Sequence, residues 1–276
     1  MNTVEVVPAA AESPMRDAPG ADEILDIALC MGEALLHAGS DVHRVEDTMT
    51  RVCTAYGCAR SDVFVIPTMI MADVTLADGS TVHGMRRVGR TYTHLTRLEE
   101  INALSRSICA SPLPADEVKR RLADIRARRP VPEWLCYIGG LLATGSFTLF
   151  FGGTWRDGLC ASLIGLLMIL AARHPAIRLA VNDLGRTSIT SFFAGLLAVL
   201  SVAVGLGQHV DMVIVGTIML EIPGLSMGNA IRDLLCGDLI SGLLRFCQSV
   251  LCALVMALSY IAALALTNIL WGGLAL

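Results

Sequence analysis

The sequence lacks most of the motifs by which enzymes and metal-binding proteins are recognised. Residues 21–130 have no GxSxG, HExxH or glycine-rich phosphate loop, so nothing marks this part of the chain as a hydrolase, zinc protease or nucleotide-binding protein. Its nine cysteines form no CxxC pair, and no histidine lies at ligand spacing from Cys53 or Cys58, as a zinc site requires. We therefore expect reduced thiols, no metal and no cofactor.

Charge is scarce in one half of the chain. Residues 1–133 hold 15 of the 21 basic and 19 of the 25 acidic residues, which leaves few for the remaining 143. The mean hydropathy of +0.62 is high for a water-soluble protein. The net charge of −4 gives no argument for nucleic-acid binding. A polar front half and an apolar back half predict a water-soluble domain followed by a membrane domain.

The first 20 residues are rich in alanine, proline and acids. They lack the apolar segment of a signal peptide. This composition predicts a disordered tail over residues 1–20.

Residues 21–130 predict a small α+β domain. Apolar residues recur at helical spacing in two segments that Gly39 separates, and Ser40 is expected to cap the second. The segments DVFVIP and TMIMADVTL alternate, LADGS contains an Asp-Gly turn, and TVHGMRRV returns as a strand. Two more helices are expected around 94–109 and 115–128. The order of two helices, three strands and two helices is typical of an α+β fold.

One polar cluster in this domain suggests either chemistry or simple solvation. The stretch HAGSDVHRVEDTM places His43 and Asp47 one helical turn apart. The cluster consists of His43, Arg44, Glu46 and Asp47. A hydrolase site is one interpretation. We favour the other, in which these residues form the charged face of an amphipathic helix.

The back half predicts an α-helical membrane domain over residues 131–276. A crossing helix needs about 20 apolar residues, or fewer inside a bundle. Uncharged segments predict five transmembrane helices, the fourth broken at a Pro-Gly pair, at about 134–155, 158–172, 187–208, 212–231 and 246–271.

Arginines in the short loops predict the orientation of these helices. One set precedes the first segment in RRLADIRARR, and the others lie between segments two and three or four and five. The opposite side has only Arg156. Because basic loops stay in the cytoplasm, the front domain is expected there and the C-terminus outside. The arginines between segments are Arg173, Arg178, Arg186, Arg232 and Arg245.

The stretch EIPGLSMGNAIRD, residues 221–233, interrupts the apolar sequence. Pro223 cannot donate a helical hydrogen bond, and broken backbone survives in hydrocarbon only where protein or water satisfies it. The residues that follow place Ser226, Asn229 and Asp233 on one helical face. Two interpretations stay open for the charged groups nearby. Either they line a route for substrate or ions, or they pair in a cytosolic loop; the groups are Arg232, Asp233, Asp238 and Arg245. Glu221 and Asn229 favour the route, because both are expected nearer the membrane interior.

The sequence resembles the threonine/serine exporter (ThrE) family, and most closely its short, YjjP-type subunits of a two-component exporter. The resemblance rests on LLHAGSDVHRVEDTM, VFVIPTMIMADVTLADGSTVHGMRRV, RLEEINALSRSI and LEIPGLSMGNAIRDLLCGDLISGLLR. It covers nearly all of residues 22–272. The sequence departs from the family pattern at Glu221, where an apolar residue is common, and at Arg232, where relatives vary.

The resemblance implies an inner-membrane secondary transporter that exports threonine and serine, or dicarboxylates such as succinate, and uses the proton gradient. It implies a smaller membrane subunit as partner, in a homo- or hetero-oligomer surrounded by lipid. The pathway residues that it implies are Pro223, Gly224, Asn229, Asp233, Gly237 and Asp238. A membrane-anchored hydrolase and a regulatory scaffold, each using the cytosolic domain, are the alternatives.

Overall fold

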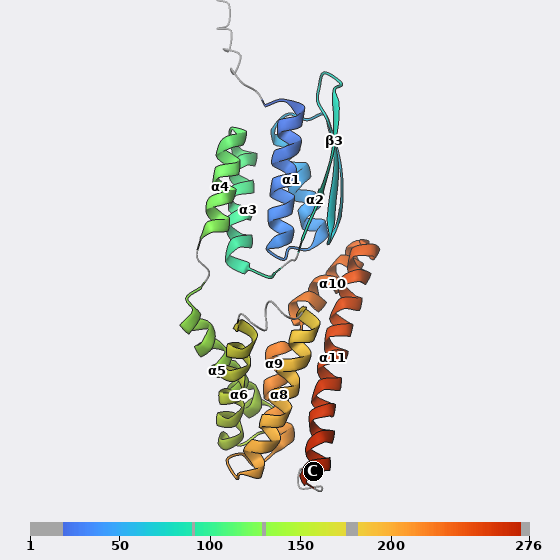
Figure 1. Ribbon diagram of the computed structural model, residues 1–276. Coiled ribbons are helices and arrows are strands. Elements are labelled where there is room, and N and C mark those ends of the chain that lie inside the picture. Colours follow the sequence, from blue (N-terminus) through green and yellow to red (C-terminus); the bar gives the residue numbers. More distant parts are fainter. Residues whose placement is uncertain (1–18, 90–91, 129–130, 175–181, 272–276) are drawn as a thin grey trace, which may run out of the picture. The chain divides into compact units, whose positions relative to one another are not determined.

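The computed structural model describes residues 19–89, 92–128, 131–174 and 182–271 (Figure 1). Most of the tail expected over residues 1–20, together with Arg178 and the C-terminal residues 272–276, lies outside these ranges. The chain divides into two compact units, Met1–Arg126 and Ala127–Leu276.

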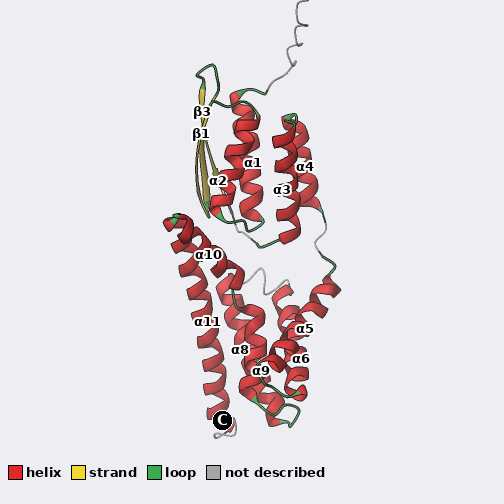
Figure 2. Cartoon of the chain, turned by 180° about the vertical axis from the view of Figure 1, so that it is seen from behind, coloured by secondary structure: helices red, strands yellow, loops and turns green. Residues whose placement is uncertain are grey.

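The first unit combines four helices with one small sheet, in the order expected from the sequence. Figure 2 shows the helices packed beside the strands. The strands form an antiparallel sheet with β2 in the middle. The elements are α1 (Ala21–His37), α2 (Val42–Ala55), β1 (Arg60–Ile66), β2 (Met69–Thr75), β3 (Thr81–Arg87), α3 (Leu95–Ala110) and α4 (Ala115–Ala127).

Buried and exposed side chains alternate along the strands, and the buried ones lie on the face of the sheet that joins the core. Val65, Ile70 and Val74 are buried in the same cluster as the apolar residues of α1 and α2. Helix α1 approaches β3 at Gly84, where a Cβ atom would lie 2.8 Å from a methyl group of Leu25. A side chain at this position would push the helix away from the sheet, so glycine allows the core to close.

Local hydrogen bonds determine both ends of α2. Its N-terminus is capped by Asp41, which accepts a hydrogen bond from the backbone N–H of Arg44 at 2.9 Å. The expectation that Ser40 is the cap is therefore wrong by one residue. At the other end Gly57 has a φ of 84°, and the N–H of Cys58 donates to the carbonyl of Cys53 at 3.1 Å.

This geometry explains why Cys53 and Cys58 lie together. In this helix-ending motif the residues at these two positions pack against each other. Burial raises the pKa of the Cys53 thiol to about 12, so the group is a neutral core side chain at physiological pH.

The second unit consists of helices and includes three that are long and apolar enough to cross a membrane: α6, α8 and α11. Helices α9 and α10 meet the same test only as a pair, bent by 56° at a short break. The described residues thus contain three or four candidate crossings. The helices are α5 (Glu133–Phe150), α6 (Trp155–Arg173), α8 (Asp183–Ala203), α9 (Val210–Glu221), α10 (Gly224–Cys236) and α11 (Leu239–Trp271).

Several helix boundaries differ from those expected. The segment 134–155 forms α5, which ends at Phe150 and is not among the three long apolar helices. The segment 187–208 forms α8, which ends at Ala203. Helix α11 begins at Leu239, before the expected 246. Backbone hydrogen bonds continue through charged residues such as Arg245, so the end of an apolar run does not end a helix.

Small residues bring the helices of this unit close together. A Cβ atom at Gly216 of α9 would overlap Thr148 Oγ1 of α5 and lie 2.8 Å from the Thr144 carbonyl oxygen. A Cβ atom at Gly195 of α8 would lie 2.8 Å from the Cβ of Ala263 on α11. The hydrophobic effect contributes little to the association of helices in lipid. Close van der Waals contact of this kind therefore holds the bundle together.

We predict that Gly216→Ala destabilises the protein, whereas Gly139→Ala does not. Alanine favours a helix over glycine by about 1 kcal/mol at both positions. At Gly216 the new methyl group meets backbone of α5, and overpacking of this kind costs about 1–3 kcal/mol. At Gly139 no atom lies within 4 Å of the added Cβ. Thermal unfolding of the purified variants in detergent, followed by tryptophan fluorescence, measures the difference. Equal midpoints would show that α5 and α9 do not depend on this contact.

Candidate functional site

The predicted break in the fourth apolar segment is present. Helix α9 ends at Glu221 and α10 begins at Gly224, with Pro223 between them. The two helix axes differ by 56°. Pro223 is the N-cap residue of α10, and proline has neither a backbone N–H group nor a side-chain acceptor. Its side chain therefore makes no capping hydrogen bond to the first turn of α10. The break places irregular backbone beside Glu221.

The carboxylate of Glu221 is held by helix α8. The hydroxyl of Thr190 donates a hydrogen bond to one carboxylate oxygen, and the hydroxyl of Ser191 donates to the other. Both hydroxyl-bearing residues are buried. An ionisable side chain within a membrane segment is expensive and usually functional. Glu221 therefore lies in a polar site between α8 and α9 and not on the lipid-facing surface.

The same face of α9 has a second buried polar contact, with helix α11. The hydroxyl of Tyr260 donates to Thr217 Oγ1 at 3.1 Å. Thr217 lies one helical turn before Glu221, so the two side chains share a face. Tyr260 and Thr217 were not among the site residues expected from the sequence. A tyrosine within an otherwise apolar helix was the signal available, because a buried tyrosine hydroxyl needs a partner.

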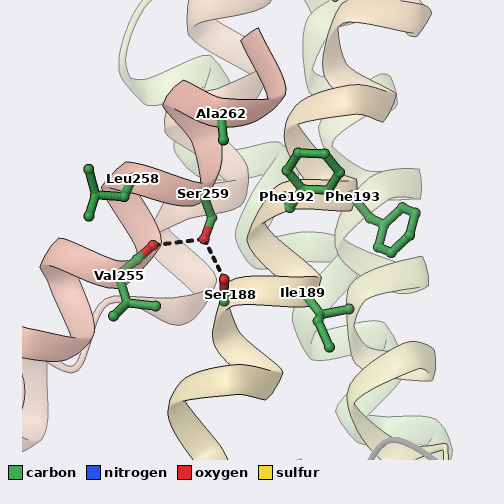
Figure 3. A pocket seen from close by; sticks show the side chains of 8 residues that line it. All are labelled: Ser188, Ile189, Phe192, Phe193, Val255, Leu258, Ser259 and Ala262. Atoms are coloured by element: carbon green, nitrogen blue, oxygen red, sulfur yellow. Dashed lines mark hydrogen bonds between the residues drawn. The ribbon is translucent and has the colours of Figure 1, made fainter. Parts of the chain in front are cut away.

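A cavity of about 440 Å³ lies between α8 and α11. Figure 3 shows the hydroxyls of Ser188 and Ser259 pointing toward each other, with aromatic and aliphatic side chains around them. Their oxygen atoms are 2.9 Å apart, and Ser259 also donates to the carbonyl of Val255 at 2.8 Å. The remaining lining residues are apolar. This cavity suits hydrocarbon better than a charged metabolite.

Asp233 and Arg245 form a charged pair between α10 and α11. The Nη1 and Oδ2 atoms are 3.6 Å apart, Asp233 is fully buried and the Arg245 side chain is 13% exposed. Gly237, with a φ of 96°, reverses the chain between the helices. Gly242 packs against Leu234, so the two helices meet closely. Arg232, Asp233 and Arg245 thus belong to helices, whereas Asp238 lies in the turn between α10 and α11. Asp233 and Arg245 pair with each other.

The other predicted pathway residues divide into two groups by exposure. Pro223, Asn229 and Asp238 are partly buried. Gly224, Ser226, Arg232 and Gly237 are exposed. The expected polar face of α10 therefore turns progressively inward, from exposed Ser226 through Asn229 to buried Asp233.

The polar cluster of the first unit has separate structural partners. Glu46 accepts a hydrogen bond from the backbone N–H of Val65 at 2.8 Å, which ties α2 to β1. Asp47 pairs with Arg51 at 2.9 Å one turn along the helix. His43 and Arg44 are exposed. These contacts favour the amphipathic-helix interpretation.

A buried carboxylate outside the predicted site is Asp157. It accepts hydrogen bonds from the backbone N–H groups of Gln208 at 2.5 Å and His209 at 3.0 Å. Its other oxygen contacts the backbone N–H and hydroxyl of Thr154 and the His209 Nδ1 atom. The signal was a threonine followed three residues later by an acid before an apolar run, which indicates a capping box. Asp157 joins the starts of α6 and α9.

Comparison with known proteins places this architecture in a family. The family model described as "Putative threonine/serine exporter" matches residues 26–267. The chain belongs to this threonine/serine exporter family. Members of the family are transporters and not enzymes, which confirms the prediction of a transporter.

Three relatives illustrate the range of the exporter family. The chain is 24% identical over 229 residues to the "Probable threonine/serine exporter" of Mycobacterium tuberculosis, covering 81% of this chain and 42% of the relative. It is 22% identical over 244 residues to the "Threonine/serine exporter" of Corynebacterium glutamicum, covering 83% and 48%. It is 21% identical over 245 residues to the "Probable succinate transporter subunit YjjP" of Klebsiella aerogenes, covering 86% and 90%. The chain spans about half of the length of the first two relatives. No solved structure matches it.

We predict that Asp157→Asn destabilises the protein strongly. Asparagine has one acceptor oxygen and presents an NH₂ group to backbone N–H donors, and each buried donor left without a partner costs about 1–3 kcal/mol. Asp183→Asn is the matched control, because Asp183 also lies in the first turn of an apolar helix but is exposed, and it pairs with Arg186. The control should change stability by no more than about 0.5 kcal/mol. Denaturation in detergent compares the two, and similar losses would argue against the bracing role of Asp157.

Proposed function

We propose that this chain is one subunit of a proton-coupled exporter in a bacterial inner membrane. Its substrates would be small polar metabolites, either threonine and serine or a succinate-like dicarboxylate. The main support is the Glu221 carboxylate, held by hydroxyl groups of α8 directly beside the α9–α10 break.

The break and the carboxylate support the proposal together. Irregular backbone within hydrocarbon needs protein or water to satisfy its polar groups. A carboxylate at the same place gives a group that can exchange a proton or bind an ammonium group. A helix that served only as an anchor would need neither. Water-filled space at this break is therefore the simplest route for a polar solute.

The charges near the break suit an amino acid better than a dianion. An ammonium group needs an anionic partner, which Glu221 supplies. A carboxylate needs cationic or N–H donors, which arginine side chains and the start of α10 supply. A succinate-like dianion would use only the second set. The names of the relatives include both threonine/serine and succinate. Our preference for an amino acid therefore rests on the charges near the break.

Five crossings agree with the distribution of arginines. Helices α5, α6, α8 and α11 would each cross once, and α9 with α10 would cross as one broken helix. The front domain would then lie in the cytoplasm and the C-terminus outside.

The expected partner is a smaller membrane subunit of the same family. Two relatives about twice as long have exporter names, whereas the relative of similar length is named a subunit.

We predict that Glu221→Gln removes most export while Asp211→Asn leaves it intact. Glutamine cannot exchange the proton or balance an ammonium charge. Asp211 is an exposed carboxylate in the first turn of the same helix α9, so it controls for loss of one negative charge. Efflux of preloaded labelled serine, threonine and succinate would be measured in cells that produce the chain with its natural partner. The amount of inserted protein must be equal in all samples. Normal efflux by the Glu221 variant would exclude the carboxylate from the transport route.

A second prediction concerns the number of crossings. Five crossings place the two ends of the chain on opposite sides of the membrane, whereas a re-entrant α9–α10 pair would leave an even number and both ends on one side. Reporter enzymes that work only inside or only outside the cell, fused in turn to each terminus, measure this. We expect a cytoplasmic N-terminus and an external C-terminus. Both termini on one side would refute the five crossings.

A further inference from the structure

The second unit contains two charged sites, the Glu221 carboxylate between α8 and α9 and the Asp233–Arg245 pair between α10 and α11. Helix α11 reaches both of them. Arg245 near its start contacts α10, and farther along Tyr260 donates a hydrogen bond to Thr217 of α9. The face of α11 between these two contacts therefore connects the surroundings of the two charged sites.

Polar side chains continue along this face of α11. Ser249 and Cys252 follow Arg245 at spacings of four and seven residues, so the three side chains lie on one side of the helix. Ser249 is buried, and the other two are partly buried. The large apolar side chains exposed at this level of the helix are Leu243, Leu244, Phe246, Val250 and Leu251. The polar stripe Arg245–Ser249–Cys252 thus faces the interior of the unit, away from the apolar surface.

Cys252 connects the polar stripe to the site of Glu221. Its side chain forms a hydrogen bond with Thr187 of α8, and the Glu221 carboxylate lies within electrostatic range of the thiol. Thr187 lies one helical turn before Thr190 and Ser191, the two residues whose hydroxyls donate to Glu221. Hydrogen-bonding groups therefore extend from α11 to the carboxylate.

The hydroxyl of Ser249 indicates that the polar stripe meets a ligand. Ser249 is 2% exposed, and its Oγ atom has no hydrogen-bond partner among the residues that the structure describes. A buried hydroxyl without a partner destabilises the fold, and alanine would occupy the same place without this cost. The serine is explained if its hydroxyl gains a partner in another conformation, either water or a polar solute.

We propose that the polar stripe lines one leg of the transport route, along which a carboxylate-bearing solute moves between Arg245 and Glu221. This inference rests on the proposed export function. The guanidinium fork of Arg245 matches a carboxylate, a group that serine, threonine and succinate share. The Ser249 hydroxyl and the Cys252 thiol then replace hydrogen bonds that the solute loses with water. Because Ser249 is closed to solvent in this conformation, the leg opens between α11 and its neighbours during transport.

The first experiment separates transport from packing at Ser249. Ser249→Ala removes the unpartnered hydroxyl, so the thermal midpoint in detergent should stay the same or rise. Efflux by the chain with its natural partner, at equal amounts of inserted protein, should fall about two- to tenfold, the effect of one lost hydrogen bond between neutral groups. Ser201→Ala is the matched control, because the Ser201 hydroxyl on α8 donates to the Ala198 carbonyl oxygen at 2.7 Å; its efflux should be unchanged. Full efflux by Ser249→Ala, or a fall in efflux with a lower thermal midpoint, would overturn the proposal.

The second experiment tests whether the leg opens to polar solutes. Membrane fragments open on both sides are treated with sulfonatoethyl methanethiosulfonate, an anion that forms a mixed disulfide with a thiol and releases methanesulfinate. Peptide mass spectrometry measures the modification of each cysteine. We expect Cys252 to be modified, and an excess of the solute that the parent chain exports to slow the reaction. Cys136 is the matched control, because it is also partly buried in a helix of this unit, and the solute should not slow its modification.

The outcomes distinguish this inference from the proposed function. An unmodified Cys252, or modification that the exported solute does not slow, would overturn the role of the polar stripe and leave the export function in place. A parent chain that exports none of serine, threonine and succinate would overturn the proposed function and this inference with it.

Discussion

Peptide groups cannot hydrogen-bond to hydrocarbon, and this constraint explains where the apolar unit is regular and where it is not. Its long helices satisfy their own backbone. At the two places where the path of α9 begins and ends, a carboxylate is present. Asp157 at the beginning accepts five contacts, two of them from the backbone of Gln208 and His209. Glu221 at the end accepts two, both from hydroxyl groups. Backbone donors are fixed, whereas hydroxyls rotate and can be replaced by water or solute. The first site is therefore suited to holding the fold and the second to exchange.

The two sides of α9 differ for a related reason. On one side Gly216 meets backbone of α5 at contact distance. Interlocked contact of this kind resists sliding because any shift produces overlap or a void. On the other side Thr217 and Glu221 reach α8 and α11 through hydroxyl groups. The net energy of such hydrogen bonds is about 0.5–1.5 kcal/mol between neutral groups and about 1.5–3 kcal/mol to a charged group. Because rotating hydroxyls can exchange these partners for water or solute, we expect rearrangement during transport on this side.

Features that depend on local chemistry could be predicted from the sequence. Features that depend on how the helices pack could not. A Pro-Gly pair breaks a helix wherever it occurs, and alternating residues with an Asp-Gly turn form strands, so the α9–α10 break and the order of the first unit were expected. The contacts of Glu221 with Thr190 and of Tyr260 with Thr217 join residues 31 and 43 positions apart. They depend on which helix faces meet, and an apolar helix gives little periodicity to indicate this. The predicted ends of the apolar helices were wrong by several residues. They were placed where charged residues end an apolar run, but backbone hydrogen bonding continues past such residues.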